Sequence, residues 1–240
     1  MKKATWMLVI LGSFLFLGVI ASSLILRNQF SKVDKSDPFW NYSKLSTGSF
    51  HHIVLLNSNK TQVSFTPGAR GSVGVLNFWE SELRKRVHAA IENDTLFVRM
   101  EDRDDPPGMR DWMSYRTLIA ISAPEIYSVQ ARNANLNMFK MKQKNFTVNL
   151  SGKSRMEFET YTDRFDSLSI TQNDSTELKF EMADEIGSSM SLHANSLYSS
   201  IHGYSILDIG HFQIDSFHPL IGTGSAITLS GGTLTGISKN

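Results

Sequence analysis

The sequence has no cysteine among its 240 residues. This absence excludes a thiol nucleophile, a cysteine-ligated zinc site, a disulfide framework and a lipid-modified cysteine anchor. An excess of charge of one sign is also missing, because 24 Lys and Arg residues balance 23 Asp and Glu residues and leave a net charge of +1. A protein without a strong positive field is poorly suited to polyanions, so we expect no nucleic-acid partner.

Long apolar runs occur once, at the N-terminus. Residues 4–26 carry no charge, and as a helix they would reach about 34 Å, which spans a bilayer. A cleaved signal peptide is the alternative, because Val19-Ile20-Ala21 has the spacing of a cleavage site. We predict a membrane anchor or signal segment at 1–26. The domain that follows is then either periplasmic and anchored in the inner membrane or exported to the cell surface.

Residues 27–49 mix charge, Ser and Pro without an apolar period, which is typical of a linker. From residue 50 to residue 240 the dominant pattern is alternation of apolar and polar residues, as in Ile53/Leu55, Val63/Phe65 and Val148/Leu150. Such alternation predicts short strands with one buried face. Turn-forming residues separate them, among them Asn57-Ser58-Asn59. The segment 80–86 predicts a helical turn leading into a strand.

The C-terminal half shows a weak internal repeat. Apolar residues recur at intervals of about 20 residues, with Ser/Gly clusters nearby: Leu150, Ile170, Leu192, Ile209 and Leu229. Such a period predicts an all-β fold in which each coil of a β-solenoid buries its inward residues against the next. A β-sandwich is the structural alternative, because short strands at 8–12-residue spacing also fit that fold.

Four segments and the closing Ser/Gly coils form a recognisable pattern: Phe50-His51-His52-Ile53, Val63-Ser64-Phe65-Thr66-Pro67-Gly68, Asn93-Asp94-Thr95-Leu96-Phe97-Val98 and Ile119-Ala120-Ile121-Ser122-Ala123-Pro124. With these segments, residues 50–234 resemble the GIN-domain family, described as an auto-transporter adhesin head in exported and membrane-anchored proteins of Bacteroidota. The resemblance implies a right-handed parallel β-helix and assigns no catalytic residue. The segment 131–135 departs from the family pattern, because it lacks the glycine usual after the first coil strand.

Few residues suggest a chemical site. The densest acidic cluster lies in 101–111, where Asp102, Asp104 and Asp105 are candidates for a ligand loop. A solvated loop is the stronger interpretation, because arginines nearby in sequence can pair with these acids. His193, His202 and His211 recur every nine residues, which does not match a coil of about 20, so we predict isolated surface histidines. We expect no catalytic residue, no metal site and no cofactor.

Three Asp-Ser/Thr pairs resemble the O-glycosylation acceptor that the family resemblance implies. The modified residues would be Thr95, Ser167 and Ser175. The same dipeptides are ordinary turn pairs.

The sequence therefore predicts a membrane-anchored or exported, non-catalytic β-solenoid module. Its expected role is adhesion in the cell envelope, by binding a glycan or a protein partner. The alternatives are a polysaccharide-active β-helix enzyme, which would need carboxylates clustered on one face, and an accessory protein in envelope signalling.

Overall fold

The computed structural model describes residues 2–34, 37, 39–77, 85–101, 117–141, 143–159, 164–181, 193–210, 212–229 and 233. The chain divides into two compact units, Met1–Asn41 and Tyr42–Asn240. The second is called the β unit below.

The first unit is dominated by helix α1, Lys2–Ser31. Its stretch Thr5–Ser31 is long and apolar enough to cross a membrane by length and composition. No acidic residue occurs in the helix, and every described side chain from Thr5 to Leu26 is exposed. The helix continues past Leu26 into residues for which a linker was predicted, because Arg27 and Gln29 are good helix formers and no Pro or Gly interrupts residues 27–31.

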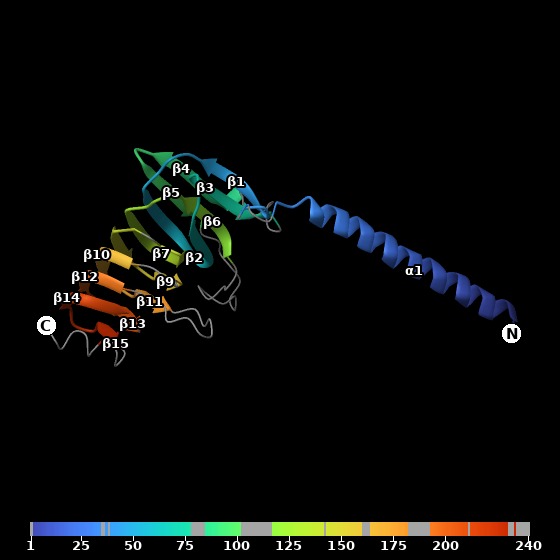
Figure 1. Ribbon diagram of the computed structural model, residues 1–240. Coiled ribbons are helices and arrows are strands. Elements are labelled where there is room, and N and C mark those ends of the chain that lie inside the picture. The colour runs from blue at the N-terminus through green and yellow to red at the C-terminus, as the bar shows by residue number, and fades with distance from the viewer. Residues whose placement is uncertain are drawn as a thin grey trace. The chain divides into compact units, whose positions relative to one another are not determined.

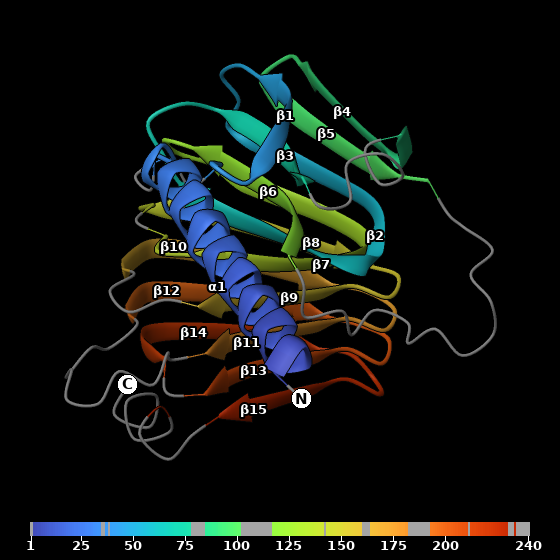
Figure 2. The same ribbon diagram turned by 90° about the vertical axis from the view of Figure 1, so that its right-hand side faces the viewer.

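The β unit is built from fifteen described strands (Figures 1 and 2). The strands that precede the repeated part are β1 (Tyr42–Thr47), β2 (His52–Pro67), β3 (Ser72–Leu76), β4 (Val87–Glu92), β5 (Thr95–Met100), β6 (Thr117–Ala123) and β7 (Ser128–Phe139). Those that follow are β8 (Asn145–Ser151), β9 (Arg155–Glu159), β10 (Arg164–Gln172), β11 (Glu177–Glu181), β12 (His193–Ile201), β13 (Ile206–Gly210), β14 (Gln213–Ile221) and β15 (Ala226–Leu229).

Two ladders of parallel strands run through the C-terminal half. The first ladder is β7–β8–β10–β12–β14, and the second is β7–β9–β11–β13–β15. Figure 2 shows the strands of each ladder one below the other. The first half of β7 pairs with β8 and its second half with β9, so this strand belongs to both ladders.

The N-terminal strands make the sheet mixed. β1 pairs antiparallel with β3, β3 with β6, and β4 with β5. The expectation of a parallel β-helix over the whole range 50–240 was therefore wrong for the N-terminal strands. For β4 and β5 a short connection accounts for the difference, because antiparallel neighbours need only a tight turn, here Asn93-Asp94, whose residues both have positive φ.

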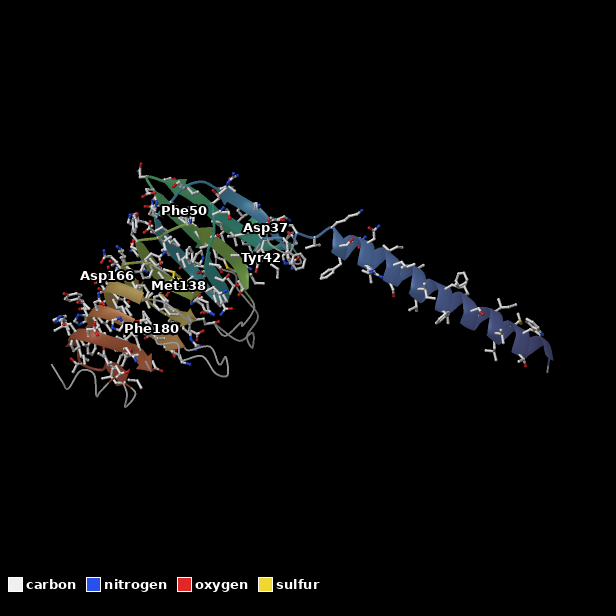
Figure 3. All side chains as sticks on the ribbon, in the orientation of Figure 1. Asp37, Tyr42, Phe50, Met138, Asp166 and Phe180 are labelled. Carbon is white, nitrogen blue, oxygen red and sulfur yellow. The ribbon has the colours of Figure 1, made fainter. Side chains whose placement is uncertain are left out.

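One apolar core lies between the two ladders. Phe158 on β9 contacts Phe146 on β8 and Phe165 on β10, both with ring centroids 6.1 Å apart. Within the second ladder Phe158 stacks on Phe180, at 4.9 Å. Figure 3 labels Phe180 together with Met138, a fully buried side chain of β7. The alternating residues of the strands therefore supply one continuous core, as the sequence pattern predicted.

The register corrects two details of the predicted pattern. Leu150 pairs with Gln172, not with Ile170, so the apolar recurrence was read two residues out of register. The predicted turn at 57–59 lies inside β2, which is continuous over 16 residues. Asn57 does adopt a positive φ of 56°, but it introduces a bulge where we expected a chain reversal. Leu192 and residues 80–84 lie outside the described residues.

Candidate functional site

The outward side of the first ladder is a regular polar surface, which we call the hydroxyl face. It consists of outward residues on β2, β7, β8, β10, β12 and β14, whose inward neighbours form the core. Register aligns them in three rows across the strands: Asn145, Ser167, Ser196 and Ser216; His52, Ser128, Thr147, Ser169, Tyr198 and His218; Gln130, Asn149, Thr171, Ser200 and Leu220. We call the second of these the central row.

Aromatic rings stand at both ends of the central row. Tyr198 stacks on His218 with ring centroids 4.7 Å apart and planes 11° apart, and 47 % of Tyr198 is exposed. At the other end Tyr127 stacks on His51 at 4.9 Å and meets His52 edge-on. The His51 ring nitrogen also contacts Asp94 Oδ1 at 2.8 Å, which fixes the ring. The nearby Glu125 carboxylate raises the pKa of Tyr127 above its ordinary value.

Small side chains with hydroxyl groups lie between these rings. Ser128 is hydrogen-bonded to the ring of His52 at 2.7 Å. Within the described residues, no protein group bonds to the hydroxyls of Thr147 and Ser169. Adjacent strands are about 4.8 Å apart, so Ser128 and Tyr198 are separated by about 14 Å. The hydroxyl face thus offers hydrogen-bonding groups at regular spacing, bounded by aromatic rings.

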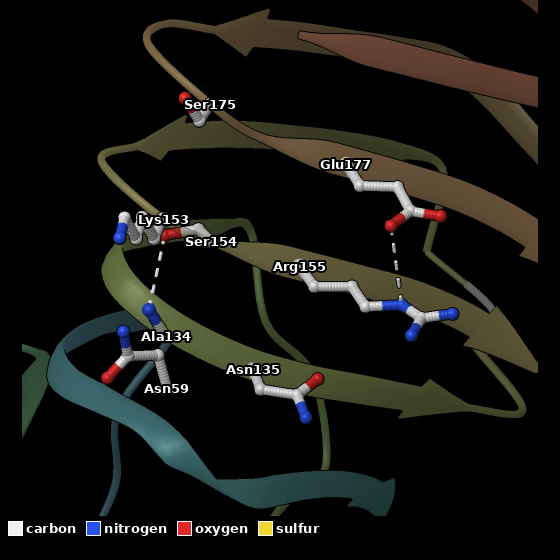
Figure 4. Close-up of a pocket in the computed structure, with 8 residues that line it drawn as sticks. All are labelled: Asn59, Ala134, Asn135, Lys153, Ser154, Arg155, Ser175 and Glu177. Atoms are coloured by element: carbon white, nitrogen blue, oxygen red, sulfur yellow. Dashed lines mark hydrogen bonds and ion pairs between the residues drawn. The ribbon is translucent and has the colours of Figure 1, made fainter. Parts of the chain in front are cut away.

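A polar pocket lies at the junction between β2, β7, β9 and β11 (Figure 4). Ser58 pairs with Ala134, but the next paired residue of β2 is Gln62, opposite Asn135. Residues 59–61 therefore bulge out of the ladder and leave space between β2 and the following strands. The resulting cavity has a volume of about 220 Å³, and we call it the bulge pocket. Its lining residues are Asn59, Ala134, Asn135, Lys153, Ser154, Arg155, Ser175 and Glu177.

Asparagine and aspartate side chains fix the turns that border the bulge pocket. Asn133 Oδ1 accepts a hydrogen bond from the backbone nitrogen of Lys153 at 2.9 Å, and Asp174 Oδ2 accepts one from Gly152 at 3.0 Å. Gly152 has a φ of 66°, and a Cβ there would lie 2.3 Å from Asn133 Oδ1. Glycine at this position therefore allows the turn between β8 and β9 to pack closely on Asn133 of β7. Lys153 lies in the same turn.

The strand side of the bulge pocket contains a charged row. Register places Asn135, Arg155 and Glu177 side by side on β7, β9 and β11. Arg155 binds Glu157 at 2.5 Å and lies 3.7 Å from Glu177 Oε2. The guanidinium is mostly buried, with 22 % of the side chain exposed, whereas 38 % of Glu177 is exposed. Glu177 therefore keeps carboxylate surface that a ligand can reach.

The ligand-loop and glycosylation residues that the sequence predicted do not come together in one site. Asp102, Asp104 and Asp105 lie outside the described residues, and their neighbour Glu101 contacts the His88 ring at 2.8 Å. Of the predicted glycosylation residues, Thr95 begins β5 and donates weakly to Asn93 O at 3.4 Å. Ser167 belongs to the hydroxyl face, and Ser175 is exposed at the bulge pocket. The three therefore share no common surface.

The described histidines have separate partners. His193 contacts Asp215 at 2.9 Å, and His202 contacts Ser200 at 3.0 Å, while His211 lies outside the described residues. Among the described residues, no group of three or more His, Asp or Glu side chains is arranged to hold a metal ion.

Sequence reasoning missed both the hydroxyl face and the bulge pocket. The hydroxyl face unites residues from His52 to His218, which only the register aligns. The one available signal was the recurrence of Ser, Thr and Asn at outward strand positions. The bulge pocket had a local signal in Asn57, because Asn in a strand pattern tolerates the positive φ that a bulge requires.

No protein-family model matches the chain, and no curated protein matches it. Solved structures give weak matches. A candidate adhesin from Bacteroides fragilis has a TM-score of 0.49 at 11 % identity, covering 78 % of this chain and 94 % of that one. A candidate lipid-binding protein from Parabacteroides distasonis has a TM-score of 0.39 at 10 % identity, with 79 % and 96 % covered. A candidate adhesin from Parabacteroides merdae has 0.32 at 12 %, with 79 % and 95 % covered.

These TM-scores are below 0.5. What the structure itself defines is a mostly β protein with one apolar N-terminal helix.

Proposed function

We propose that this protein is a membrane-tethered, non-catalytic binding module whose hydroxyl face binds a glycan. The observation that carries the proposal is the central row, where Thr147 and Ser169 lie between the aromatic pairs His51–Tyr127 and Tyr198–His218. Helix α1 would hold the module at a membrane. The GIN-like assignment and the adhesion role remain part of this proposal.

The β unit is, in this proposal, a β-solenoid from β7 onward. Leu150 pairs with Gln172, and Ile201 with Ile221, so equivalent positions recur after about 20 residues. One longer step joins Gln172 to Ile201. Parallel pairing of successive chain segments, with one core enclosed by two ladders, is the arrangement that a solenoid requires.

A sugar chain fits the chemistry of the central row. Each pyranose has hydroxyls that exchange hydrogen bonds with Ser, Thr and Asn, and an apolar ring face that packs on aromatic rings. The length of one sugar unit in an extended glycan is close to the strand spacing of about 4.8 Å. One face of the Tyr198 ring is taken by His218, and the other borders the small residue Ser169. A sugar over Ser169 would therefore contact the second face of Tyr198.

Catalysis is the weaker alternative, because glycoside hydrolysis needs a pair of carboxylates beside the bound sugar. The three rows of the hydroxyl face contain no Asp or Glu. Nearby acids have basic partners, as Asp94 has His51 and Asp215 has His193. These contacts indicate that the two acids hold neighbouring side chains in place. They do not favour a role in which the acids act on a substrate.

The test is binding of labelled oligosaccharides to the full chain in detergent micelles. The probes are cellohexaose and the hexamer of β-1,4-linked N-acetylglucosamine, followed by fluorescence anisotropy. Removing one stacked ring loses about 1 kcal/mol, so we expect Tyr198→Ala to weaken binding by five- to tenfold. Tyr204→Ala is the matched control, because this tyrosine is 81 % exposed at a turn outside the rows. No binding of either hexamer, or equal losses in both variants, would overturn the proposal.

A further inference from the structure

The bulge pocket has two chemically different sides. Figure 4 shows Asn59, Lys153 and Ser175 at the turn side, and Asn135, Arg155 and Glu177 along the strands. Within the described residues, no ion pair or hydrogen bond involves the side chains of Asn59, Lys153 or Ser175. The turn side therefore presents an ammonium, an amide and a hydroxyl that are available to a ligand.

The strand side complements these donors with an acceptor. Arg155 is already bound to Glu157, and Glu177 lies at a looser 3.7 Å from the same guanidinium. The side chains of Lys153, Arg155, Glu157 and Glu177 have a net charge of zero. A simple anion therefore gains little from the pocket as a whole. A ligand with a negative group toward Lys153 and hydroxyl donors toward Glu177 fits both sides.

We infer that the bulge pocket binds one carboxylate-bearing sugar residue of the hexuronate type, with its carboxylate on Lys153 and its hydroxyls on Glu177. A cavity of about 220 Å³ has room for one such residue. Asn59 adds hydrogen bonds to the same sugar residue from the bulge in β2, and Ser175 adds them from the turn before β11. The inference rests on the proposed glycan-binding function, and it assigns an acidic unit to the glycan.

The position of the pocket suits a glycan that also occupies the hydroxyl face. Asn149 and Thr171 of that face lie on β8 and β10, and the turns that follow these strands hold Lys153 and Ser175. Lys153 is only four residues beyond Asn149. A branched or bent acidic oligosaccharide would therefore reach the pocket at the edge of the face.

The experiment compares two probes that differ in whether their carboxyl groups are charged or methylated. Labelled hexagalacturonate and its methyl ester are titrated against the full chain in detergent micelles, at low and high salt. Lys153 is exposed, and one ion pair to an exposed lysine changes affinity by about two- to fivefold, so we expect the free acid to bind about two- to fivefold more tightly than the ester at low salt. This preference should shrink as salt screens the Lys153 charge. Lys153→Gln should remove the preference without changing ester binding. Lys144→Gln is the control, because this exposed lysine precedes the opposite end of β8.

The outcomes separate the two proposals. Equal binding of acid and ester by the unaltered protein, or an unchanged preference in Lys153→Gln, would overturn the acidic site and leave the hydroxyl face intact. A Tyr198→Ala variant that keeps full affinity while Lys153→Gln loses the preference would support the pocket and contradict the role of the face. If neither probe nor the two neutral hexamers bind, both proposals fail.

Discussion

Leu178 and Ile227 offer a test of how the β unit is stabilised, because they occupy the same inward column of the second ladder. Register pairs Met156 with Leu178, Leu178 with Leu207, and Leu207 with Ile227. Leu178 is fully buried with a paired strand on each side. Ile227 is partly buried, and β15 has one partner strand among the described residues.

Truncation to alanine should therefore have unequal costs. Leu178→Ala leaves a closed cavity and should lower the free energy of unfolding by about 3–4 kcal/mol, within the range for buried leucines. Ile227→Ala removes atoms that are already partly in water, and about 1 kcal/mol is expected. For a unit of this size 1 kcal/mol corresponds to about 2–4 °C in Tm, so the expected decreases are about 6–16 °C and 2–4 °C.

The measurement is thermal unfolding of the full chain in detergent micelles, followed by near-ultraviolet circular dichroism, which reports the packing of aromatic side chains and not the helix content of α1. Each variant is compared with the unaltered protein at the same detergent concentration. Equal decreases in Tm would refute the reasoning, because they would mean that both positions share one closed core, as in a β-sandwich.

Three further outcomes are expected. The fragment 42–240 should resist limited proteolysis and give a far-ultraviolet spectrum dominated by strand, since every described strand lies within it; a spectrum of helix or coil would contradict this. Gly203→Ala should lower Tm by several degrees more than Gly210→Ala, because both have positive φ but only at Gly203 would a Cβ come within 2.6 Å of a backbone oxygen. Glu125→Gln should lower the pKa of Tyr127 toward its ordinary value, measured by NMR of labelled tyrosine, since the Glu125 carboxylate is the largest cause of the increase; an unchanged pKa would exclude that cause.

Much of the strand content could be predicted because alternation has a direct physical origin. Ile53 and Leu55 face the core while Val54 between them faces outward, as the period of two requires. The pairing of strands was harder to predict from the sequence. His52 pairs with Ser128, across more than 70 residues, and no local pattern encodes such a contact. Asn57 could not be assigned from sequence, because a positive φ serves a turn and a bulge equally well.

The candidate site was harder to predict than the fold. The acidic segment 101–111 was a predicted candidate because its charges are dense along the chain. Lys153 and Glu177 are separated by 24 residues and line the same pocket only because of the strand register. Polar residues that are unremarkable singly, such as Thr147 and Ser169, become a surface when parallel pairing places them on adjacent strands. Proximity in sequence is therefore a poor guide to proximity in a stacked parallel fold.

The long strand β2 has a consequence for the order in which the chain assembles. Its partners β5, β6 and β7 come from residues 95–139, so β2 stays incompletely paired until that stretch has emerged during synthesis or export. Closing such a long loop is slow, whereas each later parallel segment can add to an existing edge soon after it emerges. Changes in the pairing of β2 should then slow folding, while equally destabilising changes in β12 or β14 should mainly accelerate unfolding. We therefore expect the first paired strands to act as the folding nucleus and the C-terminal half to elongate from them.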